Sequence, residues 1–134
     1  MRTRFGAARV GELATVDSSG APHVVPVCFA LDGDVVVTAV DAKPKTTTNL
    51  RRLANVTAHP AITMLVHHYD DEDWTRLWWV RVGGRAEVVD GGAVRDEAVG
   101  LLVAKYAQYR ADPPPGAVIR AHVETWRAWE WNGP

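Results

Sequence analysis

The chain lacks the features that mark several common functional classes. Its 134 residues include 1 cysteine, so an intrachain disulfide and a zinc site built from several cysteines are both excluded. Lys and Arg number 15 against 16 Asp and Glu, giving a formal net charge of −1. That balance argues against a general nucleic-acid binder and against a polybasic membrane-surface protein. The sequence also contains no Walker A loop and no G-x-G-x-x-G fingerprint, the usual phosphate-binding signatures.

Long hydrophobic runs are absent as well. The most apolar stretch, residues 24–31, is too short to span a bilayer and contains Pro26. The sequence MRTRFG at the start has no apolar segment of the kind that signal peptides carry. We therefore expect a cytoplasmic protein that does not associate with membranes. The length fits one domain, residues 1–134.

What is present is mostly β-strand signal. Residues 10–17, 22–31 and 35–40 are rich in β-branched side chains and are separated by the turn clusters DSSG and DGD. Residues 61–69, 76–89 and 118–131 repeat the pattern, and the last of these alternates apolar with polar positions. Gly83 and Gly84 interrupt the fifth segment, which predicts a bulge or a barrel bend.

Two segments are predicted to be helical. A short helix follows the threonines at 46–48 and runs through Leu50, Leu53 and Ala54. A longer amphipathic helix over 93–109 is indicated by apolar residues at helical spacing, namely Val94, Ala98, Leu101, Leu102, Tyr106 and Tyr109. The sequence thus predicts a mainly β protein with about six mostly antiparallel strands, one short helix and one longer helix. Closure into a small barrel is favoured because it removes exposed strand edges.

Residues suited to covalent or metal chemistry are scarce. Cys28 lies in an apolar strand segment, where a buried and inert thiol is expected. His67 and His68 are adjacent on a predicted strand, so they point to opposite faces and cannot bind one ion together. The acidic run at 70–73 lacks the pattern of a calcium loop and is expected to be a solvated turn. We therefore predict no metal site and name no catalytic side chain.

The net charge conceals a local basic segment. Residues 42–69 contain no Asp or Glu, whereas Lys43, Lys45, Arg51 and Arg52 all fall there. Ammonium groups, threonine hydroxyls and a helix N-terminus together provide what a phosphate group requires. A solvated lysine loop is the alternative explanation.

The chain also carries 6 tryptophans, in two groups. Trp74, Trp78 and Trp79 form the first, and Trp126, Trp129 and Trp131 form the second. A buried indole needs a hydrogen-bond partner for its N–H, so six tryptophans are more than the core of one small domain requires. We expect most to pack in the core or at a subunit interface, and at least one to contact a planar ligand.

Several of these motifs occur in an order that resembles a known superfamily. They are LATVD at 13–17, G-x-P-H-x-x-P-V at 20–27, KPKT at 43–46, NLRRL at 49–53, and DW at 73–74 followed by WWVR-x-x-G at 78–84. Together they resemble the pyridoxamine 5′-phosphate oxidase-like split β-barrel superfamily, and more narrowly its actinobacterial coenzyme F420-dependent oxidoreductases. The resemblance covers nearly the whole chain.

The resemblance implies a split β-barrel homodimer with two cofactor sites between the subunits and a small conjugated organic substrate. The cofactor phosphate would be held by Lys43, Lys45, Thr46 and Thr47, with Asn49 close by. The deazaflavin ring would lie along Val25, Pro26 and Val27. An aromatic residue supplied across the dimer would correspond to Trp79.

Two other assignments remain open at this point. FMN shares with F420 a phosphate beside a ribityl chain, so the basic segment separates the two cofactors poorly; Arg51 and Arg52 would suit the anionic tail of F420 or simply face solvent. A non-catalytic flavin or haem carrier is the other class, and its haem ligand would be His23, His67 or His122.

Overall fold

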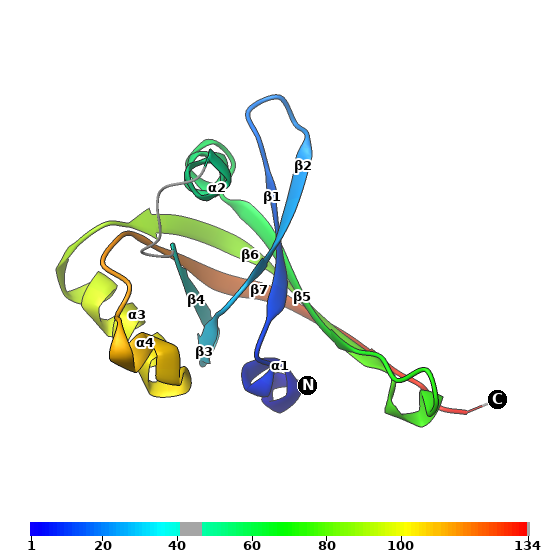
Figure 1. The fold of residues 1–134 in the computed structure, drawn as a ribbon. Helices are drawn as coiled ribbons and strands as arrows, with labels where there is room; N and C mark the ends of the chain where they lie inside the picture. The colour runs from blue at the N-terminus through cyan, green and yellow to red at the C-terminus, as the bar shows by residue number, and fades with distance from the viewer. Residues whose placement is uncertain (41–46, 134) are drawn as a thin grey trace.

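The computed structural model describes residues 1–40 and 47–133, and this part of the chain forms one curled, seven-stranded sheet. The strand order is β2-β1-β5-β6-β7-β4-β3, and every neighbouring pair is antiparallel. The sheet curls into a half-barrel, with short helices at its ends (Figure 1). The expected mainly β split-barrel architecture is confirmed.

The strands follow the predicted segments closely. They are β1 (Gly11–Val16), β2 (Pro22–Val27), β3 (Ala30–Asp32), β4 (Val35–Ala39), β5 (Ala61–His68), β6 (Trp78–Val89) and β7 (Val118–Glu130). Gly20 and Gly33 lie in the first two turns with φ of 90° and 60°, a backbone region that glycine enters without steric cost.

The segment predicted as one strand over 22–31 is divided into β2 and β3. Phe29 causes the break, because its backbone bonds to side chains rather than to a neighbouring strand. Its N–H donates to the hydroxyl of Tyr106 at 3.1 Å, and its carbonyl accepts from Lys105 Nζ at 2.8 Å. The sheet therefore has seven strands instead of six.

The helices are more numerous than the sequence predicts. They are α1 (Arg2–Ala7), α2 (Thr47–Ala58), α3 (Gly92–Lys105) and α4 (Ala107–Ala111), with the 3-10 helix η1 (Trp74–Arg76) between β5 and β6. The predicted helix over 93–109 is broken at Tyr106, which has extended dihedrals of φ −116° and ψ 121°. The break aims the phenol at Phe29, so one tertiary contact divides both a strand and a helix.

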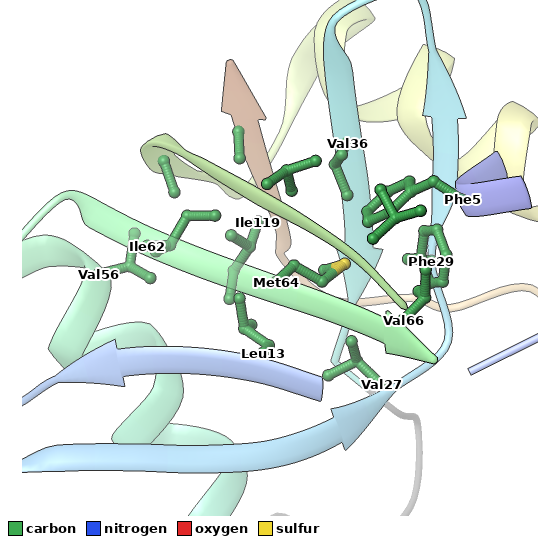
Figure 2. Close-up of a cluster of buried hydrophobic side chains, with 14 residues drawn as sticks. Phe5, Leu13, Val27, Phe29, Val36, Val56, Ile62, Met64, Val66 and Ile119 are labelled. Atoms are coloured by element: carbon green, nitrogen blue, oxygen red, sulfur yellow. The ribbon is translucent and has the colours of Figure 1, made fainter. Parts of the chain in front are cut away.

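The main core fills the inner face of the half-barrel. Leu13, Met64 and Val82 lie side by side on successive strands there, and α1 and α2 add Phe5 and Val56 (Figure 2). A second, smaller core lies where α3 packs on β3 and β4 through Leu102. The helices in the described ranges thus cover the inner face and the β3–β4 end of the sheet.

The predicted glycine irregularity in β6 is confirmed as a β-bulge. Gly83 pairs with Thr125 whereas Gly84 pairs with Val123, which leaves Glu124 as an extra residue in β7. A Cβ on Gly84 would lie 2.1 Å from the carbonyl oxygen of His122. Because that neighbour is backbone, the position requires glycine.

Beyond the bulge, β5, β6 and β7 continue past the half-barrel as a projecting arm (Figure 1). We define the arm as residues 67–79 and 129–131. At its tip the rings of Trp74 and Trp131 meet edge-on at 5.6 Å. The Asp73 carboxylate caps η1 by accepting from the backbone N–H of Thr75, and the hydrogen bonds from Thr75 lower the pKa of Asp73. The acidic turn is thus solvent-facing, as expected, and also ends the arm in a fixed shape.

Candidate functional site

The side of the sheet opposite the main core carries a row of large polar and aromatic side chains. Strand alternation sends every second residue to this side, which we call the open face. Pairing in the sheet places Pro26, Glu12, Leu65, Arg81 and Arg127 next to one another across five strands. A second row on the arm contains His67, Trp79 and Trp129.

The second row borders a groove of about 580 Å³. The groove is mainly apolar, and its lining residues are Leu65, His67, His68, Tyr69, Leu77, Trp78, Trp79, Arg81 and Trp129. The guanidinium of Arg81 lies over the Trp79 ring at 5.1 Å from its centroid, within cation–π range. The groove therefore offers aromatic surfaces together with one fixed positive charge.

Strand β2 is the part of the site predicted to lie along a cofactor ring, and its three named residues divide between the faces. Pro26 is exposed on the open face, whereas Val25 and Val27 pack against the main core. The side chains of Val25 and Val27 thus face away from a ligand on the open face, where β2 offers Pro26 and the strand backbone. Because β2 is the sheet edge in the described part of the chain, one side of that backbone pairs with no strand.

Trp79 lies on the same face as Pro26 but not beside it. Strands β1 and β5 separate β2 from β6, and three strand spacings amount to about 14 Å. A single copy of the chain therefore cannot hold one planar ring against both residues.

The predicted phosphate-binding residues are only partly described. Lys43, Lys45 and Thr46 lie outside the described residues. Thr47 begins α2 and Asn49 lies in its first turn, so the basic segment leads directly into a helix N-terminus, as the sequence predicts. Further along α2, Arg51 is exposed whereas Arg52 is buried, so solvation does not explain Arg52.

Cys28 differs from its prediction, because the thiol is exposed and not buried. Strand β2 ends at Val27, and the core position beyond it is taken by Phe29, which is fully buried. Cys28 therefore turns outward, near Lys105 and Tyr106.

Lys105 is itself held in a partly buried position that the sequence did not reveal. Its ammonium group donates to the carbonyls of Ala8 at 2.7 Å and Phe29 at 2.8 Å. Burial, with the nearby Arg9 guanidinium, lowers the pKa of Lys105 to about 8. Burial also raises the pKa of the neighbouring Tyr106.

The histidines considered as haem ligands are well separated. His23 faces inward and is half-buried, and His122 lies beside Arg120, with 2.8 Å between Nε2 and Arg120 Nη1. His67 lines the groove, with its Nε2 at 4.0 Å from a Glu12 carboxylate oxygen. Across residues 1–40 and 47–133, no three His, Cys, Asp or Glu side chains gather in a way that suits a metal ion.

Sequence reasoning missed three members of the open face. They are Arg81, Arg127 and Trp129, which add two positive charges and an indole to this face. Strand alternation along β6 identifies Trp79 and Arg81 as neighbours on one face. The same alternation fails on β7, because the extra residue Glu124 reverses the faces beyond it.

A curled antiparallel sheet with helices at its ends and an aromatic groove on its outer face defines a split-barrel binding protein. The chain belongs to the pyridoxamine 5′-phosphate oxidase family, whose model matches residues 1–130. No curated protein sequence gives a significant match. None of the helices in the described ranges combines the length and hydrophobicity needed to cross a bilayer.

Several solved structures share this fold. A haem-binding protein from Mycobacterium smegmatis superposes with a TM-score of 0.76 at 21% identity, over 99% of this chain and 53% of that chain. A haem storage protein from Vibrio cholerae superposes with a TM-score of 0.72 at 14% identity, over 96% of this chain and 91% of that chain. An FAD-binding protein from Mesorhizobium loti superposes with a TM-score of 0.69 at 22% identity, over 95% of this chain and 89% of that chain. At these identities the likeness establishes the fold.

Proposed function

We propose that the protein is a homodimeric oxidoreductase that binds a deazaflavin of the F420 type, with FMN as the alternative cofactor. In this arrangement a planar ring lies between β2 of one subunit and Trp79 of the partner subunit. The observation that carries the proposal is the separation of Pro26 and Trp79 on one open face. One copy cannot enclose a ring between them, whereas two copies facing each other can.

The open face fits such a ring in two respects. Pro26 supplies a flat apolar contact, and the free edge of β2 supplies backbone C=O groups, with N–H groups only at its non-proline positions, for the polar rim of a ring. Lys43, Lys45, Thr46, Thr47 and Asn49 are the residues that we expect to bind the phosphate. The start of α2 at Thr47 supports this expectation, because anions are stabilised at helix N-termini.

The chemistry in this proposal comes from the cofactor, which supplies a hydride when it is bound in its reduced form. The chain's own residues bind the cofactor, orient a small conjugated substrate and exclude water. Such a reaction needs no nucleophile. We therefore assign no side chain a covalent role.

A titration with F420 and with FMN tests the proposal. Trp79 and Trp129 should report binding, because a conjugated ring beside an indole quenches its fluorescence. We expect saturable quenching at micromolar concentration by at least one of the two cofactors, and a stronger response to F420. Failure of both to bind would overturn the proposal.

Haem is the second candidate ligand, and one observation favours it. His67 lies in an aromatic groove wide enough for a planar group, and haem-binding proteins are among the structures with this fold. Addition of haemin should then give a Soret band that His67→Ala abolishes. His122→Ala is the control, because His122 lies outside the groove.

A further inference from the structure

We infer that the open face holds a planar, unsaturated carboxylate, anchored by Arg81 and Arg127 over the indoles of Trp79 and Trp129. This inference rests on the proposed function, and it names the class of substrate that the same site would take. Arg81 and Trp79 lie on β6, and Arg127 and Trp129 lie on β7.

Arg81 and Arg127 are directly opposite each other on neighbouring strands. Side chains at such positions have Cβ atoms about 4.5–5.5 Å apart, and like charges there are destabilising. A pair of this kind is relieved when an anion lies between the guanidinium groups. Arginine suits this role because its planar fork binds a carboxylate through two parallel hydrogen bonds.

Two acidic side chains on this side of the sheet lie near groups other than Arg81 and Arg127. Glu87 pairs with Arg120 at 3.6 Å, and Glu12 lies 4.0 Å from His67. Within the described ranges, the ion pairs include neither Arg81 nor Arg127. Arg127 Nη1 donates to the carbonyl of Trp126 at 3.0 Å, and the other N–H groups of the two guanidiniums can bind an external carboxylate.

The aromatic side chains beside the two arginines determine which kind of group can carry the carboxylate. Trp79 and Trp129 are paired with each other on the same face of the sheet. They lie in the row next to the arginines along the two strands. Trp79 already holds the Arg81 guanidinium over its ring. A ligand whose carboxylate reaches the arginines therefore extends its body over two indoles, where flat conjugated surfaces pack best.

Calorimetric titration with 2-naphthoate and with the neutral 2-naphthamide tests this inference. We expect naphthoate to bind the wild-type protein about tenfold more tightly than the amide, a ratio that matches one charged hydrogen-bonded contact. In Arg81→Gln and Arg127→Gln the preference should disappear. Arg120→Gln is the matched control, since its partner is Glu87, and it should retain the preference.

The outcomes separate this inference from the proposed function. Equal binding of the two probes, absence of binding, or an unchanged preference in both variants would overturn it. Titration of the same variants with F420 and FMN gives a second comparison. If Arg81→Gln and Arg127→Gln weaken cofactor binding and leave the naphthoate preference intact, the arginines bind the cofactor's own anionic groups, and the inference is wrong while the proposed function stands.

Discussion

Single side chains decide where this sheet bends, and Gly84 is the clearest case. A methyl group there would collide with the backbone carbonyl of His122. The atoms that a Cβ on Gly84 would meet belong to the β7 backbone, so the collision cannot be relieved without separating β6 from β7. We expect Gly84→Ala to lower the free energy of unfolding by about 3 kcal/mol, the upper part of the range for overpacked sites.

Urea unfolding followed by tryptophan fluorescence measures this loss. Gly100→Ala is the matched control, because Gly100 lies in α3 with open space around it. Alanine in a helix interior is favoured over glycine by about 0.5–1 kcal/mol. The control should therefore be slightly more stable than the wild type, and a Gly84→Ala protein of wild-type stability would contradict the close approach at the bulge.

Lys105 gives stability an unusual pH dependence. Its pKa is lowered to about 8 in the folded chain from 10.5, so the unfolded chain binds more protons between these values. Stability should therefore rise with pH from 8 to about 9.5. Above that range Tyr106 has the opposite effect on stability. Its pKa is raised in the folded chain, so the folded chain holds the phenol proton more tightly than the unfolded chain, and stability falls as pH increases.

Unfolding midpoints at intervals from pH 7 to 9.5 check this sign. Lys105→Met serves as the reference, since it removes the titrating group and retains the aliphatic chain. The wild type should gain stability relative to the variant as pH rises. A difference that is constant across the range would show that Lys105 does not titrate there.

Lys45 tests the phosphate assignment. Lys45→Ala should weaken binding of the preferred cofactor by about 1.5–3 kcal/mol, the value of a hydrogen bond to a charged group. Lys45→Arg keeps the charge and should lose much less. Equal affinities of Lys45→Ala and the wild type would mean that the phosphate lies elsewhere.

Helix α2 is attached to the sheet by a buried polar contact. Asn55 Nδ2 donates to the hydroxyl of Thr15 on β1 at 3.0 Å, and both side chains are almost fully buried. Losing one partner leaves the other unsatisfied, so Asn55→Ala should cost about 1–3 kcal/mol. Because Thr15→Val removes the second group, a double-mutant cycle in urea should show a positive coupling energy. Additive losses would exclude a direct bond.

The elements also show how far the sequence could be interpreted. Strand positions, the glycine irregularity and the split-barrel class follow from alternation, turn residues and motif order. The division of 22–31 and the break at Tyr106 do not, because each depends on hydrogen bonds between Phe29 and residues about 77 positions away. The exposure of Cys28 and the burial of Arg52 are likewise tertiary effects.

The candidate site could be predicted less completely than the fold. Trp79 and Pro26 were identified from motifs, but their separation on the sheet depends on strand order. Arg127 and Trp129 were missed because β7 changes faces at Glu124. The assignment of a phosphate to Lys43, Lys45, Thr46, Thr47 and Asn49 stays a prediction.

The assembled molecule should be a dimer through the open face. Val24 is 60% exposed on β2, on the same face as Trp129, which is 44% exposed. This face also carries the mainly apolar groove, and contiguous apolar surface of this kind is typical of surfaces that associate. We expect sedimentation velocity to show a dimer that Val24→Glu dissociates.

Val94→Glu is the control for this experiment. Val94 is 46% exposed but lies on α3, which packs on β3 and β4 at the other end of the sheet. That variant should remain dimeric. A monomeric wild type, or dissociation by both variants, would contradict an interface on the open face.

The bulge has a consequence for how this chain tolerates insertion and deletion. Glu124 is the one residue by which β7 exceeds β6 at the bulge. Deleting it would leave one residue of β7 opposite each residue of β6, and Thr125, Arg127 and Trp129 would stay on the outer surface with their present partners. The same deletion would keep Trp126 on the inner surface, against Phe5. Loss of the bulge residue would therefore remove the local bend of β7 without exchanging the inner and outer faces of the residues that follow.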